Sequence, residues 1–69
     1  MRGKFHKVWE DSRGWMYVVR PHSGGYRGCC RKKGEQGWRA VKSLVDEEER
    51  KAEKDLERYA VNHGMKRVI

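Results

Sequence analysis

Apolar and polar positions alternate over three short stretches in the first half of the chain. The stretches 4–11 (KFHKVWED), 15–21 (WMYVVRP) and 26–32 (YRGCCRK) are rich in aromatic and β-branched residues, which is typical of β-strands. The segments SRG and HSGG between them predict turns. We therefore expect an antiparallel sheet that begins with a hairpin.

Two further features limit this sheet. Pro21 has no backbone N–H, so we expect the second strand to end there or to lie at an edge. After a turn at KGEQG, the stretch 38–44 (WRAVKSL) is either a fourth short strand or an extended lead into a helix.

The spacing of apolar residues changes after residue 46 to that of an amphipathic helix. The residues at this spacing are Ala52, Leu56, Tyr59 and Ala60. Asp46 is the expected N-cap, with Glu49 completing a capping box. Gly64 suits a left-handed C-terminal cap, and MKRVI (65–69) is a candidate for a final short strand.

These elements predict one α+β domain over residues 1–69. Its order is β-β-β-(β)-α, a small antiparallel three- to four-stranded sheet with one C-terminal helix on one face. Alternation places Phe5, Trp9, Trp15, Tyr17, Val19, Tyr26 and Cys30 on the face that suits the helix. The opposite face, expected to be open and cationic, holds His6, Val8, Met16, Val18, Arg20, Arg27, Cys29 and Arg31.

Charge is distributed unevenly along the chain. The 69 residues are 36% apolar and 39% charged, with a formal net charge of +7. Residues 1–44 hold 11 basic and 3 acidic side chains, a net +8, whereas residues 45–69 hold 6 basic and 7 acidic ones, a net −1. Such a cationic segment attracts nucleic acid, an anionic membrane surface or an acidic protein patch.

The sequence does not suggest a membrane protein or an exported one. No apolar run approaches the roughly 20 residues that span a bilayer, and the first ten residues lack the apolar core of a signal peptide. We expect a cytoplasmic protein with no membrane partner.

The adjacent thiols Cys29 and Cys30 raise the question of redox, metal or catalytic chemistry. Neighbouring strand residues point to opposite faces, so the two thiols are badly placed to share a metal or a disulfide. The histidines do not supply the paired spacing of a zinc site. Nearby arginines can activate a thiolate, but buried cysteine in a small core is the more common situation. We expect no enzyme, metal or cofactor.

The basic residues of the strands and turns are the candidate functional groups. Arginine and lysine side chains on a sheet face bind phosphates, and arginine also reads guanine. An exposed ring of Trp15 or Trp38 would instead favour a single-stranded ligand, because rings stack on unpaired bases. The candidate nucleic-acid-binding residues are Arg13, Arg20, Arg27, Arg31, Lys32, Lys33, Arg39 and Lys42.

The stretches RGWMYVVRPHSGGYRGCCRKK and DEEERKAEKDLERYA resemble the arm-binding domains of tyrosine-type integrases and the AP2-like DNA-binding fold. The resemblance implies a three-stranded sheet that reads the major groove of duplex DNA, with Arg20, Arg27 and Arg31 facing the DNA. The chain departs from this pattern in its acidic helix.

The closing stretch LERYAVNHGMKRV is similar to the ends of many small proteins of phages and mobile elements. That resemblance implies an alternative function, in which the protein binds and modulates an acidic surface of a host protein. The sequence therefore predicts a nucleic-acid-binding module, with duplex DNA slightly preferred, and keeps a protein-binding effector as the alternative.

Overall fold

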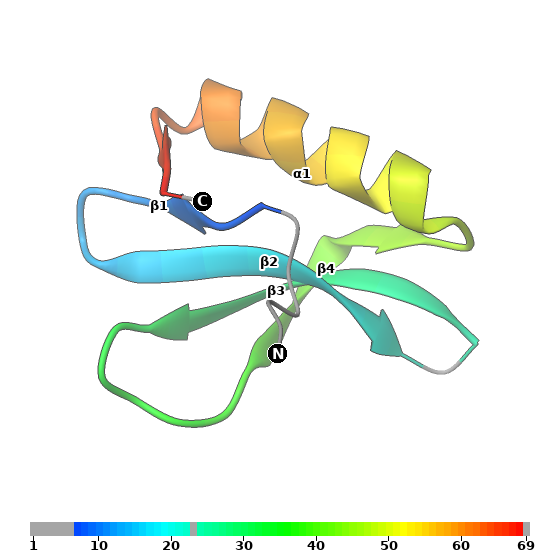
Figure 1. Cartoon of the computed structure of the whole chain (residues 1–69), viewed down its shortest axis with the longest axis horizontal. Coiled ribbons are helices and arrows are strands. Elements are labelled where there is room, and N and C mark those ends of the chain that lie inside the picture. The colour runs from blue at the N-terminus through cyan, green and yellow to red at the C-terminus, as the bar shows by residue number, and fades with distance from the viewer. Residues whose placement is uncertain (1–6, 23, 69) are drawn as a thin grey trace.

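The computed structural model describes residues 7–22 and 24–68, with Lys42 and Ser43 described by their backbone alone. Its elements are β1 (Trp9–Glu10), β2 (Trp15–His22), β3 (Gly25–Lys32), β4 (Arg39–Asp46), α1 (Glu49–Asn62) and β5 (Lys66–Arg67). The strands form an antiparallel sheet in the order β4-β3-β2-β1-β5, and α1 lies across one side of it (Figure 1).

The predicted α+β fold is confirmed, with differences at its margins. The stretch after the KGEQG turn is a full strand, and the closing segment adds β5, so the described sheet has five strands rather than three or four. The predicted first strand over 4–11 is reduced to Trp9–Glu10 among the described residues, and Phe5 and His6 lie outside them. The second strand continues one residue past Pro21.

The core lies between α1 and the sheet face that alternation predicts. Ala52, Leu56 and Ala60 of α1 are 3%, 0% and 0% exposed, which matches the predicted helical stripe. They pack on Trp9, Tyr17, Val19 and Leu44 of the sheet, and Tyr59, Trp15, Tyr26 and Cys30 pack around this cluster. Burial of these large side chains supplies most of the stability that a domain of this size can gain.

The start of α1 differs from the prediction that Asp46 is its N-cap. Asp46 is the last residue of β4, and the helix begins two residues later than the capping box requires, with Glu48 as N-cap and no side-chain capping bond. The Asp46 carboxylate accepts the backbone N–H of Glu48 at 3.1 Å instead, so it closes the turn between β4 and α1. At the other end, Gly64 has φ 68°, as predicted for a left-handed residue after a helix.

Asp11 organises the turn between β1 and β2. Its Oδ1 accepts the backbone N–H groups of Arg13 and Trp15, each at 2.9 Å. Burial opposes ionisation of Asp11, but these two hydrogen bonds hold the pKa of its carboxyl below the ordinary value. The turn therefore places Arg13 and Trp15 at one fixed end of the sheet.

The pairing of β3 with β4 contains an irregularity that the alternation of the sequence does not reveal. Arg27 pairs with Val45 and Cys29 pairs with Ala40, so residue 28 of β3 faces four residues of β4. The extra residues let Val41 and Leu44 both turn toward α1. Gly28 allows this arrangement, because a Cβ there would lie 2.7 Å from both Cβ and Cδ1 of Leu44.

We predict that Gly28→Ala lowers the free energy of unfolding by about 2 kcal/mol, because an added methyl group overpacks the Leu44 site. Gly34→Ala is the control: nothing lies within 4 Å of a Cβ there, and only its φ of 91° opposes alanine, at about 1 kcal/mol. Urea unfolding followed by tryptophan fluorescence measures both. A Gly28→Ala protein as stable as wild type would contradict the contact with Leu44.

Candidate nucleic-acid interface

Two arginines face each other on the side of the sheet opposite α1. Arg20 of β2 and Arg27 of β3 are directly paired in the strand register, so their Cβ atoms are about 5 Å apart. Like charges in this position cost stability. Within the described part of the chain, no ion pair involves either arginine, so the repulsion is not offset by a carboxylate.

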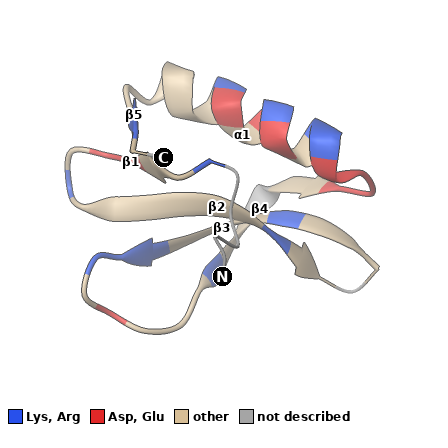
Figure 2. Cartoon of the chain, in the orientation of Figure 1, with Lys and Arg blue, Asp and Glu red and all other residues tan. Residues whose placement is uncertain are grey.

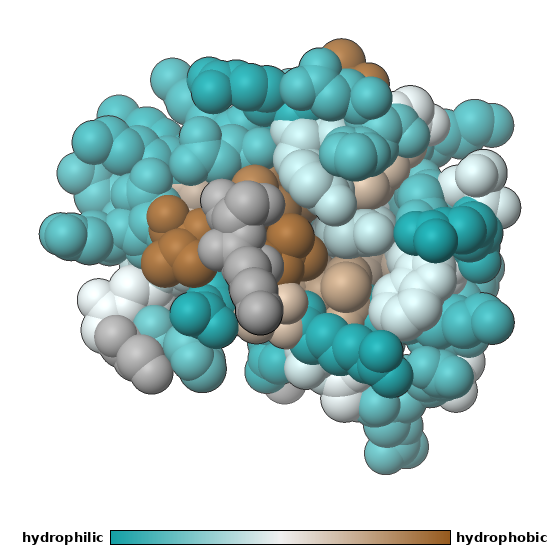
Figure 3. All heavy atoms as spheres, turned by 180° about the vertical axis from the view of Figure 1, so that it is seen from behind, coloured by the Kyte–Doolittle hydropathy of each residue, from teal (hydrophilic) through white to brown (hydrophobic). Residues whose placement is uncertain are grey.

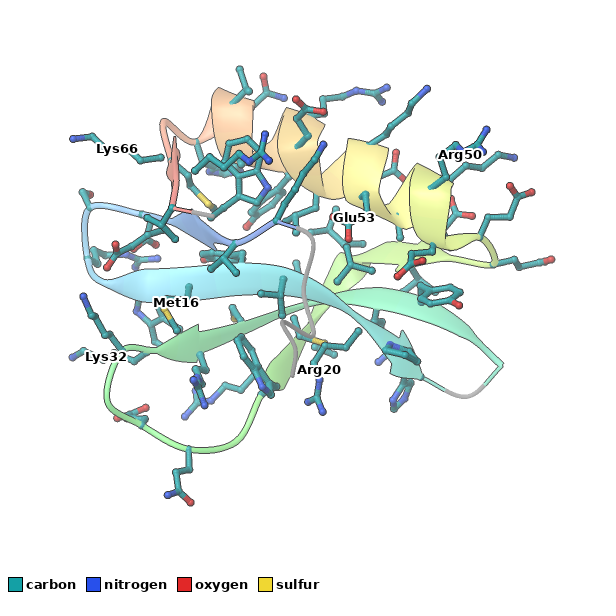
Figure 4. The ribbon with its side chains drawn as sticks, in the orientation of Figure 1. Met16, Arg20, Lys32, Arg50, Glu53 and Lys66 are labelled. Atoms are coloured by element: carbon teal, nitrogen blue, oxygen red, sulfur yellow. The ribbon has the colours of Figure 1, made fainter. Side chains whose placement is uncertain are left out.

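Arg31 continues this cationic surface along β3. It pairs with Met16 of β2, four residues from Arg27 on the same strand face. Arg31 and Arg27 are half-buried, whereas Arg20 is exposed. In Figure 4, Arg20 points from β2 away from α1, and Arg50 points from α1 away from the sheet. We call Arg20, Arg27 and Arg31 the arginine face.

The centre of the arginine face is buried rather than open as the alternation predicts. Val18 and Cys29 are directly paired between the arginines, and they are 0% and 7% exposed. Val8, on the same face, is 6% exposed. The prediction of an open face is therefore wrong for its middle, where the sheet has a second small apolar layer.

Trp38 lies against two of these arginines. The Cζ atom of Arg31 lies 4.6 Å from the centroid of the Trp38 ring, and that of Arg20 lies 5.8 Å from it. Arg20 and Arg31 stand on opposite sides of the Val18–Cys29 pair in the register. Because both guanidinium groups reach one ring, they converge on it across this pair. The half-buried indole thus belongs to the arginine face.

Three more of the predicted binding residues, Arg13, Lys32 and Lys33, lie at one end of the sheet, where the β1–β2 and β3–β4 turns meet. The backbone N–H of Lys33 donates to the carbonyl of Gly14 at 2.9 Å, which joins the β3–β4 turn to the β1–β2 turn. Lys32, Lys33 and Arg13 are exposed there. Arg13 is paired with Asp11 at 3.4 Å, so Lys32 and Lys33 are the more available cations of this end.

Arg39 does not lie on the arginine face. It pairs with Cys30, which contacts the core on the α1 side, and its Cζ atom lies 5.6 Å from the centroid of the Trp15 ring. It therefore flanks the other side of the sheet. The side chain of Lys42 lies outside what the structure describes. Of the eight predicted residues, the structure brings Arg20, Arg27 and Arg31 to one face and Arg13, Lys32 and Lys33 to its adjoining end. Lys32 pairs there with Trp15 and so lies on the α1 side of the sheet.

The charge of the molecule is segregated in space as well as in sequence. Most Asp and Glu residues lie along α1 and the segment that leads into it, where basic residues alternate with them. The charged residues of β2, β3 and the start of β4 are Lys and Arg (Figure 2). Seen from behind, hydrophobic atoms gather in the middle and hydrophilic atoms surround them (Figure 3).

The set of site residues predicted from the sequence leaves out Lys66, Arg67 and Trp38. Lys66 and Arg67 form β5 at the sheet edge. Arg67 pairs with Trp9 on the α1 side, whereas Lys66 pairs with Glu10, which is in register with Met16 and Arg31 on the other side of the sheet. The signal that Trp38 belongs to the arginine face is its spacing of two residues from Ala40, which pairs with Cys29.

Cys29 and Cys30 are both free, and they point to opposite faces as predicted. Burial raises the pKa of the Cys29 thiol, and the charges of Arg20 and Arg27 oppose this shift without reversing it. Burial also raises the pKa of Cys30, with the neighbouring Cys29 acting in the same direction. The thiols are thus protonated groups at neutral pH, which does not favour nucleophilic chemistry.

The described residues contain no group of three histidine, cysteine or acidic side chains placed to hold a metal ion. A shallow hollow lined by His22, Gly25, Arg27 and Asp46 adjoins the arginine face at the β2–β3 turn. The described helix is neither long nor apolar enough to cross a membrane.

Comparisons with protein-family models, with curated proteins and with solved structures give no match. The resemblances to integrase arm-binding domains, to the AP2-like fold and to small phage proteins therefore stay predictions. The geometry of the arginine face carries the functional argument by itself.

We predict that the Cys29 thiol of a Cys30→Ser protein reacts with Ellman's reagent at pH 8 at least roughly tenfold more slowly in the native state than in denaturant. Burial raises the pKa of Cys29 in the folded protein. The stability that its protonated thiol contributes is therefore fully present below the pKa of the unfolded thiol, and it is lost as pH rises from there through the folded pKa.

The matched control for this measurement is Cys29→Ser, which retains the half-buried Cys30. Its thiol should react faster than Cys29 because it is less buried. Rapid native labelling of Cys29 at pH 8 would show that the middle of the arginine face is open after all.

Proposed function

We propose that this protein is a non-enzymatic nucleic-acid-binding module that holds duplex DNA on its arginine face. The observation that carries the proposal is the direct pairing of Arg20 with Arg27, without a carboxylate partner within the described residues. A fold of this size keeps a repulsive pair at a cost in stability. Phosphates bound between such guanidinium groups offset this cost.

The dimensions of the surface favour a duplex. Four residues separate Arg27 from Arg31 along β3, which is about 13 Å at the rise of a strand. The major groove of B-DNA is about 12 Å wide, and two-stranded β-ribbons enter it. The strand positions of Arg27 and Arg31 are therefore about as far apart as the two phosphate walls of this groove.

The tryptophans support the same choice of ligand. Trp15 and Trp38 are half-buried, and each ring is covered on one side by an arginine. A ring that stacks on a guanidinium group is less accessible to an unpaired base. Neither Trp15 nor Trp38 therefore has the exposed ring that would favour a single-stranded ligand.

We predict that Arg20→Glu weakens binding to a labelled 25-base-pair duplex by about tenfold or more, since it removes one phosphate contact and adds a repulsive charge. The slope of log K against log salt should fall by about 0.9. The same change gives Arg27 an opposite charge across the strands, so stability should stay within about 0.5 kcal/mol of wild type or rise. Fluorescence anisotropy and thermal unfolding measure the two effects.

Arg50→Glu is the matched control, because it changes the net charge equally on the outer side of α1 (Figure 4). Its affinity should stay within about twofold of wild type at near-physiological salt. Equal losses for both variants would reduce the binding to a non-specific effect of net charge. A wild-type protein that binds neither duplex nor single strand would overturn the proposal and favour the acidic surface of a host protein as the ligand.

A further inference from the structure

We infer that Trp38 is a positioning residue that aligns Arg20 and Arg31 as a pair of phosphate ligands without itself touching the nucleic acid. The inference rests on the proposed function and specifies the ligand group as the phosphodiester backbone. The two guanidinium groups lie 5.8 and 4.6 Å from the centroid of one indole ring. Both distances are within the range of cation–π attraction.

Stacking leaves the useful part of each guanidinium group accessible. A guanidinium group that lies parallel to an indole gives the ring one flat face and keeps the N–H donors of its terminal nitrogens directed outward in its plane. A phosphate accepts two such donors side by side. A stacked arginine therefore binds the indole and a phosphate at the same time, and it loses less side-chain freedom when the phosphate arrives.

The surroundings of Arg31 fit this role. Its Nε atom is buried and has no hydrogen-bond partner among the described residues, although buried donors are nearly always paired. The contact with the Trp38 ring, 4.6 Å from the Arg31 Cζ atom to the ring centroid, stands in place of a hydrogen bond. Among the described residues, the Trp38 ring is the only interaction partner of the Arg31 guanidinium group. Loss of the ring would therefore leave the orientation of this group unconstrained.

Arg27 provides the internal comparison. It lies on the same face and pairs directly with Arg20, but within the described part of the chain no aromatic ring stacks on it. If Trp38 acts through the arginines that it touches, then its loss should affect the contribution of Arg31 and leave that of Arg27 unchanged.

The test is a pair of double-mutant cycles, with affinity measured for a labelled 25-base-pair DNA duplex. The first cycle combines Trp38→Leu with Arg31→Gln, and the second combines Trp38→Leu with Arg27→Gln. We expect Trp38→Leu alone to weaken binding by about tenfold. In the Arg31→Gln background this loss should shrink to about threefold or less, whereas in the Arg27→Gln background it should stay near tenfold.

Three measurements separate positioning from a purely structural role. Trp38→Phe, which keeps an aromatic face, should restore most of the affinity lost in Trp38→Leu, and the salt slope of Trp38→Leu should fall by up to about 1.8 for two phosphate contacts. Side-chain NMR of the free protein should show ring-current shifts for Arg20 and Arg31 that vanish in Trp38→Leu, and none for Arg27.

The outcomes are distinguishable. The positioning role would be overturned if Trp38→Leu weakened duplex binding equally in the Arg31→Gln and Arg27→Gln backgrounds. It would also be overturned if Trp38→Leu alone bound the duplex as tightly as wild type. Neither result would contradict DNA binding itself. Missing ring-current shifts in the free protein would overturn the stack itself. Absence of wild-type binding to the duplex would overturn the proposed function, and the NMR result would still report on the stack.

Discussion

The structure depends on the packing of one helical stripe against one face of the sheet. Leu56 is fully buried between Ala52 and Ala60, and these residues rest on Tyr17, Val19 and other large sheet residues. This contact decides which way every strand residue points, because neighbouring positions in a strand face opposite sides. Once Tyr17 and Val19 face α1, Val18 and Arg20 must face away. The arginine face is thus a consequence of where the core lies.

The same packing holds together charges that repel each other. In a domain of this size the core supplies only a few kcal/mol of net stability, so a like-charge pair at Arg20 and Arg27 is a noticeable cost. The direction of β2 and β3 is fixed by residues on the other face and by the Val18–Cys29 pair between the arginines. The backbone positions of the arginines are therefore fixed by other residues, and no ion pair involves Arg20 or Arg27 within the described part of the chain.

Much of this arrangement could be predicted from the sequence, because it follows from periodicity. The alternation in WMYVVRP and YRGCCRK sorts residues to the correct faces, and the spacing from Ala52 to Ala60 identifies the helix stripe. Three features could not be obtained in this way. Asp46 has the chemistry of an N-cap, but the continuation of β4 uses it as a strand end. Arg39 lies on the α1 side of the sheet because it pairs with Cys30, and this pairing cannot be read from the sequence.

The third feature, the burial of Val18 and Cys29 beneath the arginines, depends on where the β3–β4 turn returns the chain, and this is a tertiary property. It changes the physical character of the site. A freely hydrated arginine loses side-chain entropy when it binds a phosphate. An arginine already held on an indole over a buried apolar layer has lost much of that freedom during folding. Under the proposed function, the contacts that stabilise the fold on this side therefore also reduce the side-chain entropy that Arg31 loses when it binds a phosphate.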